Sequence, residues 1–290
     1  QPQQKQPEQL NADVQAWKAV EDAMGRPGEL QSDGVFKFSM PRRDLKVTVE
    51  GTDIKPGLAL GSWTAFKRMG NRAMLMGDLV LTEDEISPVM RRLVEGGVEI
   101  TALHNHVLGE SPRVMYVHIG GVGDPVKMAQ TIKAALEATK TPGPEAAPTE
   151  QSQQIGIDTA RIEQALGHKG KVKGGLLQVS VPRAKPPRMP MGNTSVEIPN
   201  SMGVATAINF QPSGNGRAAI TGDFVLLTSE VNPVIRVLGQ NGIGVTALHS
   251  HMLDETPRLF FMHFWANDDA IKLAHGLRVA LDLTGSQKSK

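Results

Sequence analysis

The stretch Thr101-Ala102-Leu103-His104-Asn105-His106 recurs further along the chain as Thr246-Ala247-Leu248-His249-Ser250-His251. The residues around the two copies match as well, and each pair is separated by the same 145 positions, from 101 to 246 for the first threonine. A repeat of this length is far longer than a solenoid unit, so the chain is a tandem duplication of one domain. The further matches are Gly77-Asp78 with Gly222-Asp223, Glu85 with Glu230, Glu110 with Glu255, Pro112-Arg113 with Pro257-Arg258, and His118 with His263.

Weaker similarity upstream extends the two repeats over most of the chain. Val20-Glu21-Asp22-Ala23-Met24-Gly25 resembles Ile162-Glu163-Gln164-Ala165-Leu166-Gly167. We therefore place repeat one at residues 10–140 and repeat two at residues 156–285, which are ordinary lengths for a domain. The segment between them, residues 141–155, is rich in proline and glutamine, and this composition predicts an extended, solvent-exposed linker.

The order of local patterns in repeat one predicts an α+β domain. Apolar residues at helical spacing predict a helix over residues 11–24, and several short β-like runs follow it. Thr82 and Glu85 have the spacing of a capping box at the start of a second helix. A β-hairpin over residues 98–119 comes next, and a last helix begins after Asp124. This order favours helices packed on an antiparallel sheet in each repeat.

Composition and charge exclude several classes of protein. Apolar residues make up 40% of the chain, which suffices for a core in each repeat. The net charge is +1 and no long run of lysine and arginine occurs, which argues against a nucleic-acid partner. The chain has no cysteine, so disulfides, thiolate metal sites and cysteine nucleophiles are excluded. No apolar run approaches the roughly 20 residues of a transmembrane helix.

The chain begins with the polar segment Gln1-Pro2-Gln3-Gln4-Lys5-Gln6-Pro7 and has no initiator methionine. Such a segment is typical of an exported protein whose signal sequence has been removed, and this is our expectation. Shortening of the chain for expression would explain the same start equally well.

Histidines mark the candidate site, because six of the eight lie in the two predicted hairpins. Side chains two positions apart on a strand share a face, so His104 and His106 point together. If the hairpin of strands 98–107 and 113–119 turns at Ser111, His104 faces His118 directly. The same spacing in repeat two brings together His249, His251 and His263, with Thr256 at the turn.

Three histidines with a carboxylate or water predict a metal site in each repeat. Such a shell suits zinc first, and copper, iron or manganese as alternatives. Glu110 and Glu255 lie in the predicted turns, as a fourth ligand or a general base. Arg113 and Arg258 begin the next strand, where they could bind an anionic group of a small-molecule substrate or simply lie exposed at the strand edge. The spacing partly resembles the metal-binding pattern of cupins, but the glycine that usually follows the glutamate is missing.

Other readings of these residues stay open. The histidines could form an acid–base or ligand-binding cluster without metal, or could pack as structural residues. For Asp78 and Asp223 we favour a role in ending a strand over a role in orienting a histidine. For Met189 and Met191 we favour core filling over a copper site. The unpaired His168 and His275 are predicted to be surface or helix residues.

The duplicated motifs, with Gly-Asp upstream and Pro-Arg downstream of each histidine pair, resemble the LppY/LpqO family of bacterial proteins over nearly the whole chain. The resemblance implies an exported or lipid-anchored protein and supplies no reaction. Lipid anchoring requires an N-terminal cysteine, which this chain lacks, so soluble export, to the periplasm or the medium, is expected.

The function that these features favour is an extracytoplasmic metal-binding protein, with metal-dependent hydrolysis as the reaction if it is an enzyme. A metal or small-ligand binding protein without turnover is the second hypothesis. A structural protein whose histidines only pack is the third.

Overall fold

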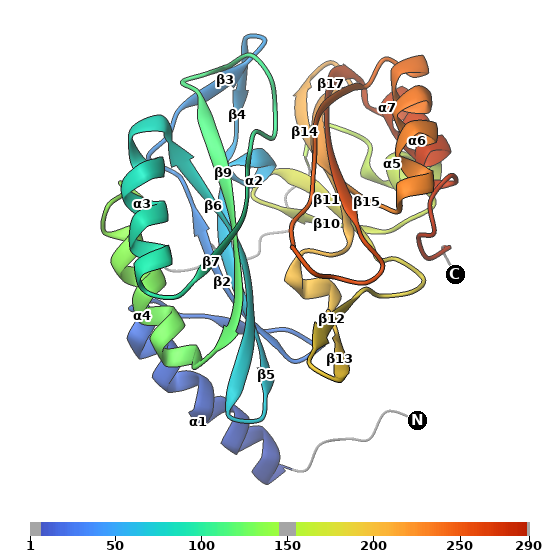
Figure 1. Cartoon of the computed structure of the whole chain (residues 1–290). Coiled ribbons are helices and arrows are strands. Elements are labelled where there is room, and N and C mark those ends of the chain that lie inside the picture. Colours follow the sequence, from blue (N-terminus) through green and yellow to red (C-terminus); the bar gives the residue numbers. More distant parts are fainter. Residues whose placement is uncertain (1–6, 145–154, 289–290) are drawn as a thin grey trace.

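Each repeat folds into a six-stranded antiparallel sheet with helices on one face, and this confirms the expected α+β duplication (Figure 1). The computed structural model describes residues 7–144 and 155–288, so the leader segment 1–6 and most of the predicted linker, residues 145–154, lie outside the described residues. In sheet order, repeat one contains β1 (Glu29–Leu30), β2 (Val35–Pro41), β5 (Gly61–Met69), β6 (Arg72–Thr82), β9 (Val114–Gly123) and β7 (Glu99–His104). Repeat two contains β10 (Gly170–Lys173), β11 (Leu176–Val181), β14 (Thr206–Gly214), β15 (Arg217–Leu226), β17 (Phe260–Asp269) and β16 (Gly244–His249).

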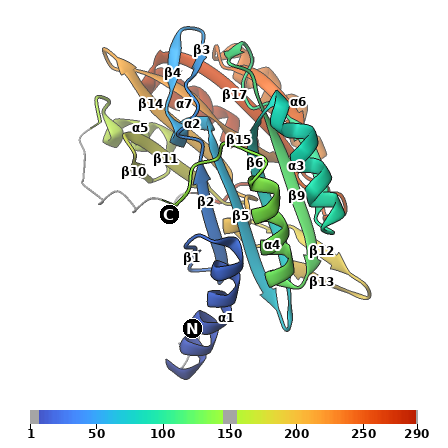
Figure 2. The same ribbon diagram turned by 90° about the vertical axis from the view of Figure 1, so that its left-hand side faces the viewer.

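The helices cover the outer faces of the two sheets, and the inner faces lie against each other (Figure 1). Figure 2 shows α3 (Glu83–Glu95) and α4 (Pro125–Leu136) on the outer face of the sheet of repeat one. None of the described helices combines the length and the apolarity needed to cross a membrane. The helices are α1 (Pro7–Met24), α3 (Glu83–Glu95) and α4 (Pro125–Leu136) in repeat one, and α5 (Thr159–Leu166), α6 (Thr228–Gln240) and α7 (Ala270–Leu281) in repeat two.

Strand β6 explains why the two halves pack in four layers. Its side chains alternate between the faces of the sheet, and those on both faces are buried. Leu75 and Leu79 point into the core under the helices of repeat one. Met76 and Val80 point the other way, into clusters shared with repeat two. The strand is therefore apolar almost throughout, as in sheets that are covered on both sides.

Two apolar clusters fill the interface between the repeats. One cluster combines Val80 and Tyr116 of repeat one with Trp265 of repeat two, beside the short helix α2 (Pro56–Ala59). The other combines Met74 of repeat one with Phe261 of repeat two, beside the 3-10 helix η1 (Asn200–Met202). The remaining short strands are β3 (Val47–Val49), β4 (Thr52–Ile54) and β8 (Glu110–Ser111), which pair with one another, and the hairpin of β12 (Arg188–Met191) and β13 (Thr194–Glu197).

A buried ion pair anchors the second helix of each repeat. Glu85 accepts the backbone N–H of Thr82, which confirms the predicted capping box at α3. The same carboxylate lies 2.6 Å from the guanidinium of Arg42, a side chain that is completely buried. In repeat two Glu230 and Arg183 form the matching pair at 2.7 Å. Arg42 and Arg183 are thus both buried in the interior of their repeats.

Candidate metal centre

The hairpin that carries the histidines has a different register from the predicted one. His118 lies opposite Ala102, and His104 lies opposite Tyr116, because the loop between β7 and β9 sets a register two positions away from the predicted one. Strand β7 also ends at His104, so His106 belongs to the following loop rather than to the strand. The predicted direct pairing of His104 with His118 is therefore wrong. Their imidazoles nevertheless stack with ring centroids 4.9 Å apart, since both side chains leave the same face of the sheet.

The six histidines form one cluster between the repeats rather than one cluster in each. The imidazoles of His104 and His249 stack with their centroids 3.6 Å apart. The expectation of a separate site in each repeat is thus corrected, because the inner faces of the two sheets bring both sets of histidines together. The other close pairs also cross the interface: His106 with His263 at 3.9 Å, and His118 with His251 at 3.7 Å.

The threonine of each repeated motif holds the histidine loop of the other repeat. The hydroxyl of Thr101 donates to the backbone carbonyl of His251 at 2.7 Å. The hydroxyl of Thr246 donates in the same way to the carbonyl of His106. This exchange accounts for a threonine at the first position of both Thr-Ala-Leu-His-x-His segments. It also fixes the two loops against each other where the histidines converge.

Two aspartates complete the cluster. Asp78 lies opposite His118 in the sheet, and its Oδ2 is 3.3 Å from Nε2 of His106 and 4.0 Å from Nε2 of His118. Asp223 lies opposite His263, with Oδ2 3.2 Å from Nε2 of His251. Both aspartates lie within their strands, so the favoured reading as strand-ending residues is wrong. An ionisable residue inside the long apolar run of β6 was the sequence signal for this position.

The donor atoms group into sets that could each hold a metal ion. His104, His106 and His263 place their ligand nitrogens within 4.8 Å of one another, and so do the donors of Asp223, His249 and His251. A third set, His104, His118 and His249, links the two. In each of the first two sets a His-x-His pair comes from one repeat, so the cluster follows the duplication.

Burial keeps the imidazoles neutral. It lowers the pKa of His106 to about 3 and that of His263 to about 3. It also lowers the pKa of His118 and of His251 well below the usual range, and the neighbouring histidines lower both further. Burial raises the pKa of Asp78. Neutral imidazole is the form that binds metal ions.

Backbone carbonyls fix which nitrogen of two histidines is available as a ligand. Nδ1 of His118 lies 3.1 Å from the carbonyl oxygen of Gly77, and Nδ1 of His263 lies 2.8 Å from that of Gly222. A carbonyl only accepts, so in the neutral ring Nδ1 carries the proton and Nε2 keeps its lone pair. These hydrogen bonds are the usual support of a metal-binding histidine.

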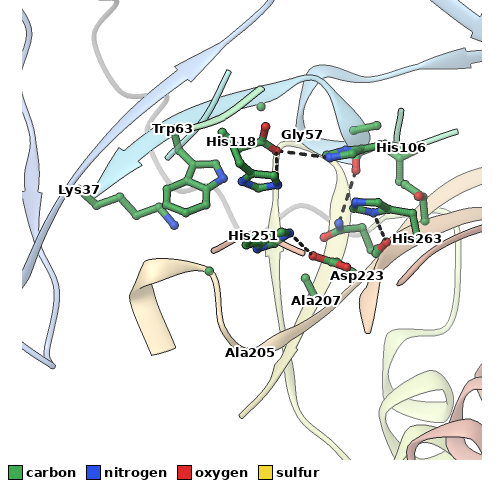
Figure 3. A pocket seen from close by; sticks show the side chains of 18 residues that line it. Lys37, Gly57, Trp63, His106, His118, Ala205, Ala207, Asp223, His251 and His263 are labelled. Atoms are coloured by element: carbon green, nitrogen blue, oxygen red, sulfur yellow. Dashed lines mark hydrogen bonds and ion pairs between the residues drawn. The ribbon is translucent and has the colours of Figure 1, made fainter. Parts of the chain in front are cut away.

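A cavity of about 250 Å³ opens beside the cluster (Figure 3). Four of the histidines and both aspartates line it, and residues of both repeats form its walls. His104 and His249 are not among the lining residues. The lining side chains that bear on the chemistry are Asp78, His106, His118, Asp223, His251, His263, Lys37 and Trp63.

The predicted turn residues Glu110, Arg113, Glu255 and Arg258 do not line this cavity. Glu255 accepts the backbone N–H of Leu259 at 2.8 Å and pairs with Arg258 at 3.3 Å, while Arg258 also donates to the carbonyl of Met252. Glu110 belongs to β8, which pairs with β3, and Arg113 is exposed. Glu255 and Arg258 thus stabilise the loop to which they belong. The catalytic role of all four residues stays a prediction.

The methionines and the unpaired histidines lie apart from the cluster. Met189 packs against the apolar cluster that contains Met74, in agreement with core filling. Met189 and Met191 also line a second cavity that reaches His251. His275 is exposed on α7 and His168 is half-buried.

Comparison with known sequences gives the chain a family. The pattern of the family described as Domain of Unknown Function (DUF1259) matches residues 18–138 and again residues 160–283. The chain belongs to this family. As a DUF1259 protein it carries the family domain twice, and the two matches coincide with the two sheets described above.

Comparison with characterised proteins adds nothing further about this DUF1259 chain. No curated protein matches it. A solved structure, titled as a trimeric bacterial microcompartment shell protein PduB, is 15% identical over 86% of this chain and 88% of its own, with a TM-score of 0.20. That similarity is too low to support any conclusion.

Proposed function

We propose that this protein binds transition-metal ions in the cluster of six histidines and two aspartates between its repeats. The observation that carries the proposal is that each of the six histidines has at least one buried ring nitrogen without a hydrogen-bond partner. Buried polar atoms are nearly always paired. Histidines that only packed would leave these nitrogens unsatisfied at considerable cost, whereas a metal ion would satisfy several of them at once.

The duplication divides the cluster into two half-sites of equal composition. The first half-site combines His104, His106 and Asp78 of repeat one with His263 of repeat two. Its support is the set of three converging histidines and the 3.3 Å contact between Asp78 and His106. Three imidazoles are donors that zinc prefers, and they leave its fourth position open for water beside the carboxylate of Asp78.

The second half-site is the counterpart of the first. It combines His249, His251 and Asp223 of repeat two with His118 of repeat one. The donor atoms of the three residues of repeat two converge, and the imidazole of His118 stacks on that of His251 with centroids 3.7 Å apart. In each half-site the third histidine is exchanged between the repeats. We therefore propose zinc as the first candidate at both positions, with copper, iron and manganese as the alternatives for the same donors.

The cavity favours a hydrolytic enzyme over a closed storage site. A bound zinc ion lowers the pKa of water and polarises a substrate oxygen, which is the chemistry of hydrolases. Both aspartates have an Oδ1 atom that is buried without a hydrogen-bond partner and belong to the lining of the cavity. These carboxylates are placed to hold or accept a proton beside a substrate in that space.

Metal analysis of the full chain tests the proposal. The protein is purified without chelator, loaded with zinc, desalted, and analysed for metal beside the double variant His104→Ala/His249→Ala. We expect about two zinc ions per chain, one for each half-site, and loss of both in the variant. A variant of the exposed His275, His275→Ala, is the matched control and should keep the full metal content. Protein that takes up none of the four metals would contradict the proposal.

Hydrolysis is tested separately on the loaded protein. A panel of p-nitrophenyl esters and phosphate esters is assayed with zinc-loaded protein, with chelated protein and with the double variant. Turnover that requires zinc and is lost in the variant would support a hydrolase. Full metal content without turnover of any ester would favour the metal-binding protein without catalysis.

We also propose that the protein works outside the cytoplasm. The absence of cysteine from all 290 residues supports this location, because an unpaired thiol is a liability in an oxidising compartment. The resemblance to the LppY/LpqO family points the same way. Fractionation of cells that express the protein from its complete gene tests this, and recovery in the cytoplasm alone would contradict it.

A further inference from the structure

The cavity beside the metal centre has one feature that breaks the symmetry of the duplication. Trp63 lies opposite Asp78 in the sheet of repeat one, and Ala207 lies at the corresponding position opposite Asp223 in repeat two. One strand further out, the position of Lys37 in β2 is occupied in repeat two by Gln178. The sheet of repeat one thus carries a tryptophan and a lysine beside its aspartate, and the sheet of repeat two carries neither at the corresponding positions.

Lys37 is a cation that forms no ion pair with any carboxylate in the part of the chain whose side chains the structure describes. Its Nζ lies 4.3 Å from the centre of the Trp63 ring and donates one hydrogen bond, to the carbonyl of Ser201 at 3.3 Å. Among residues 17–144 and 155–288, whose side chains the structure describes, no carboxylate lies within 4.0 Å of this nitrogen. Burial lowers the pKa of Lys37 to about 8, against the opposing charges of Asp33 and Glu29. An ammonium group in such a place normally has an anion as its partner.

The same lysine lines the cavity that the histidines and aspartates line. In Figure 3 its side chain runs along Trp63, and the ring lies between the lysine stem and the histidine cluster. Ala205 and Ala207 of repeat two also line the cavity, and their small side chains leave room for a ligand. The volume of about 250 Å³ is below that of a pocket for a drug-sized molecule, so the ligand is small.

The loaded metal centre adds positive charge to this space. Its histidines are neutral, and two aspartates do not neutralise two divalent cations. A bound metal ion is commonly the largest charge in its site and attracts anionic ligands. The ammonium group of Lys37 acts in the same direction from the other end of the cavity. The cavity therefore favours a ligand with negative charge.

We propose that Lys37 and the metal centre together bind the oxyanion group of a small anionic substrate, a phosphate ester or a carboxylate, in the cavity lined by Trp63. The proposal rests on the proposed function, because the metal centre supplies one side of the binding site. Lys37 is the specificity-determining residue in this arrangement. The missing counterpart in repeat two means that the substrate binds in one orientation, with its anionic group toward repeat one.

Calorimetric titration of zinc-loaded full-length protein tests the proposal. The probes are inorganic phosphate and acetate, so that the two arms distinguish a phosphate substrate from a carboxylate substrate. Lys37→Met removes the charge and keeps an apolar stem over Trp63, and Lys37→Gln introduces the residue that repeat two carries. Lys46→Gln, at an exposed position of the same repeat, is the matched control for loss of one charge. Zinc content and thermal unfolding of every variant show that the fold and the centre are intact.

The expected result is binding of at least one of the two anions by the wild type, with Kd raised about tenfold or more in both Lys37 variants. Lys46→Gln should change Kd less than about twofold. Equal affinity in the wild type and the Lys37 variants would overturn the proposal, and so would zinc-loaded protein that binds neither anion. Protein that takes up no metal contradicts the proposed function first, and this proposal falls with it. If the Lys37 variants lose zinc as well, Lys37 supports the fold and the proposal is overturned.

Discussion

The imidazole of His118 in repeat one stacks on that of His251 in repeat two, with their centroids 3.7 Å apart. His263 of repeat two lies at 3.9 Å from His106 of repeat one in the matching position. The third histidine of each motif therefore serves the His-x-His pair of the other repeat. This exchange distinguishes a shared centre from two independent sites.

Double variants can show the exchange directly. In the loaded protein, His118→Ala/His251→Ala should lose about one zinc ion, because both residues belong to one half-site. His118→Ala/His104→Ala should lose about two ions, because these residues belong to different half-sites even though both lie in repeat one. Metal analysis after desalting measures both. The reverse pattern would mean that each repeat holds its own ion.

The two aspartates should set the affinity of the centre. Asp78→Asn removes the charge beside His106 and keeps the size of the side chain. We expect the Kd for zinc to rise about 10- to 100-fold, the usual effect of losing such a carboxylate. Asp223→Asn should have the same effect through His251. Competition with a chelator of known affinity measures both, with the exposed Asp53→Asn as control. Unchanged affinity in both amide variants would exclude the aspartates from the site.

Gly222 allows strand β15 to lie close to the backbone of strand β14 beside Asp223. A Cβ atom at this position would overlap the backbone carbonyl oxygen of Ala207. Gly222→Ala should therefore lower the free energy of unfolding by about 1–3 kcal/mol and weaken zinc binding as Asp223 shifts. Gly239→Ala is the control, because nothing lies within 4 Å of a Cβ atom at that exposed helical position. It should leave zinc binding unchanged and stabilise the protein by about 0.4–1 kcal/mol.

The buried pair of Arg42 and Glu85 predicts a pH dependence of stability. Burial alone would raise the pKa of Glu85, but hydrogen bonds from Arg42 and the backbone, with the charge of Arg42, hold it below its usual value. A lowered carboxylate pKa stabilises the fold above the unfolded value of about 4.3, and this contribution is lost as pH falls through the folded value. The stability of the wild type should therefore fall below about pH 4.3.

Replacing Arg42 should reverse the direction in which the Glu85 contribution to stability changes with pH. Arg42→Met leaves Glu85 buried without its guanidinium, at a cost of about 3–5 kcal/mol at neutral pH. Without the arginine, burial raises the pKa of Glu85, so the variant should gain stability relative to the wild type as the pH is lowered toward 5. Urea unfolding at several pH values measures the difference in the free energy of unfolding between the wild type and the variant. A difference that stays constant with pH would mean that the pKa of Glu85 is the same in the folded and unfolded states. The double variant Arg42→Met/Glu85→Gln should recover part of the stability that Arg42→Met loses.

Much of the fold could be read from the sequence because its signals are local. The capping box of Thr82 and Glu85 depends on residues three positions apart, and the structure confirms it. The constant spacing of the two motifs indicates the duplication, and the order of helical and β-like patterns indicates the α+β class. The six histidines also stood out, because their number and their recurrence are properties of the chain alone.

The arrangement of the site depended on contacts that the sequence does not encode locally. The loop between β7 and β9 sets a register in which His118 lies opposite Ala102 rather than His104, and periodicity does not fix that register. Asp78 reads as a strand end in the sequence, and only the neighbouring strand shows that it faces His118. Lys37 carries no motif at all, and its position in the cavity follows from the packing of β2 beside β5.

The sequence by itself determined that two copies of one α+β domain each carry three histidines at fixed spacing. Only the tertiary structure decided that the two sets meet. The inner face of each sheet is apolar around its histidines, so burying these faces against each other stabilises the protein and draws the imidazoles together. Such packing joins residues more than a hundred positions apart, and it brings the two predicted sets of histidines into one shared cluster.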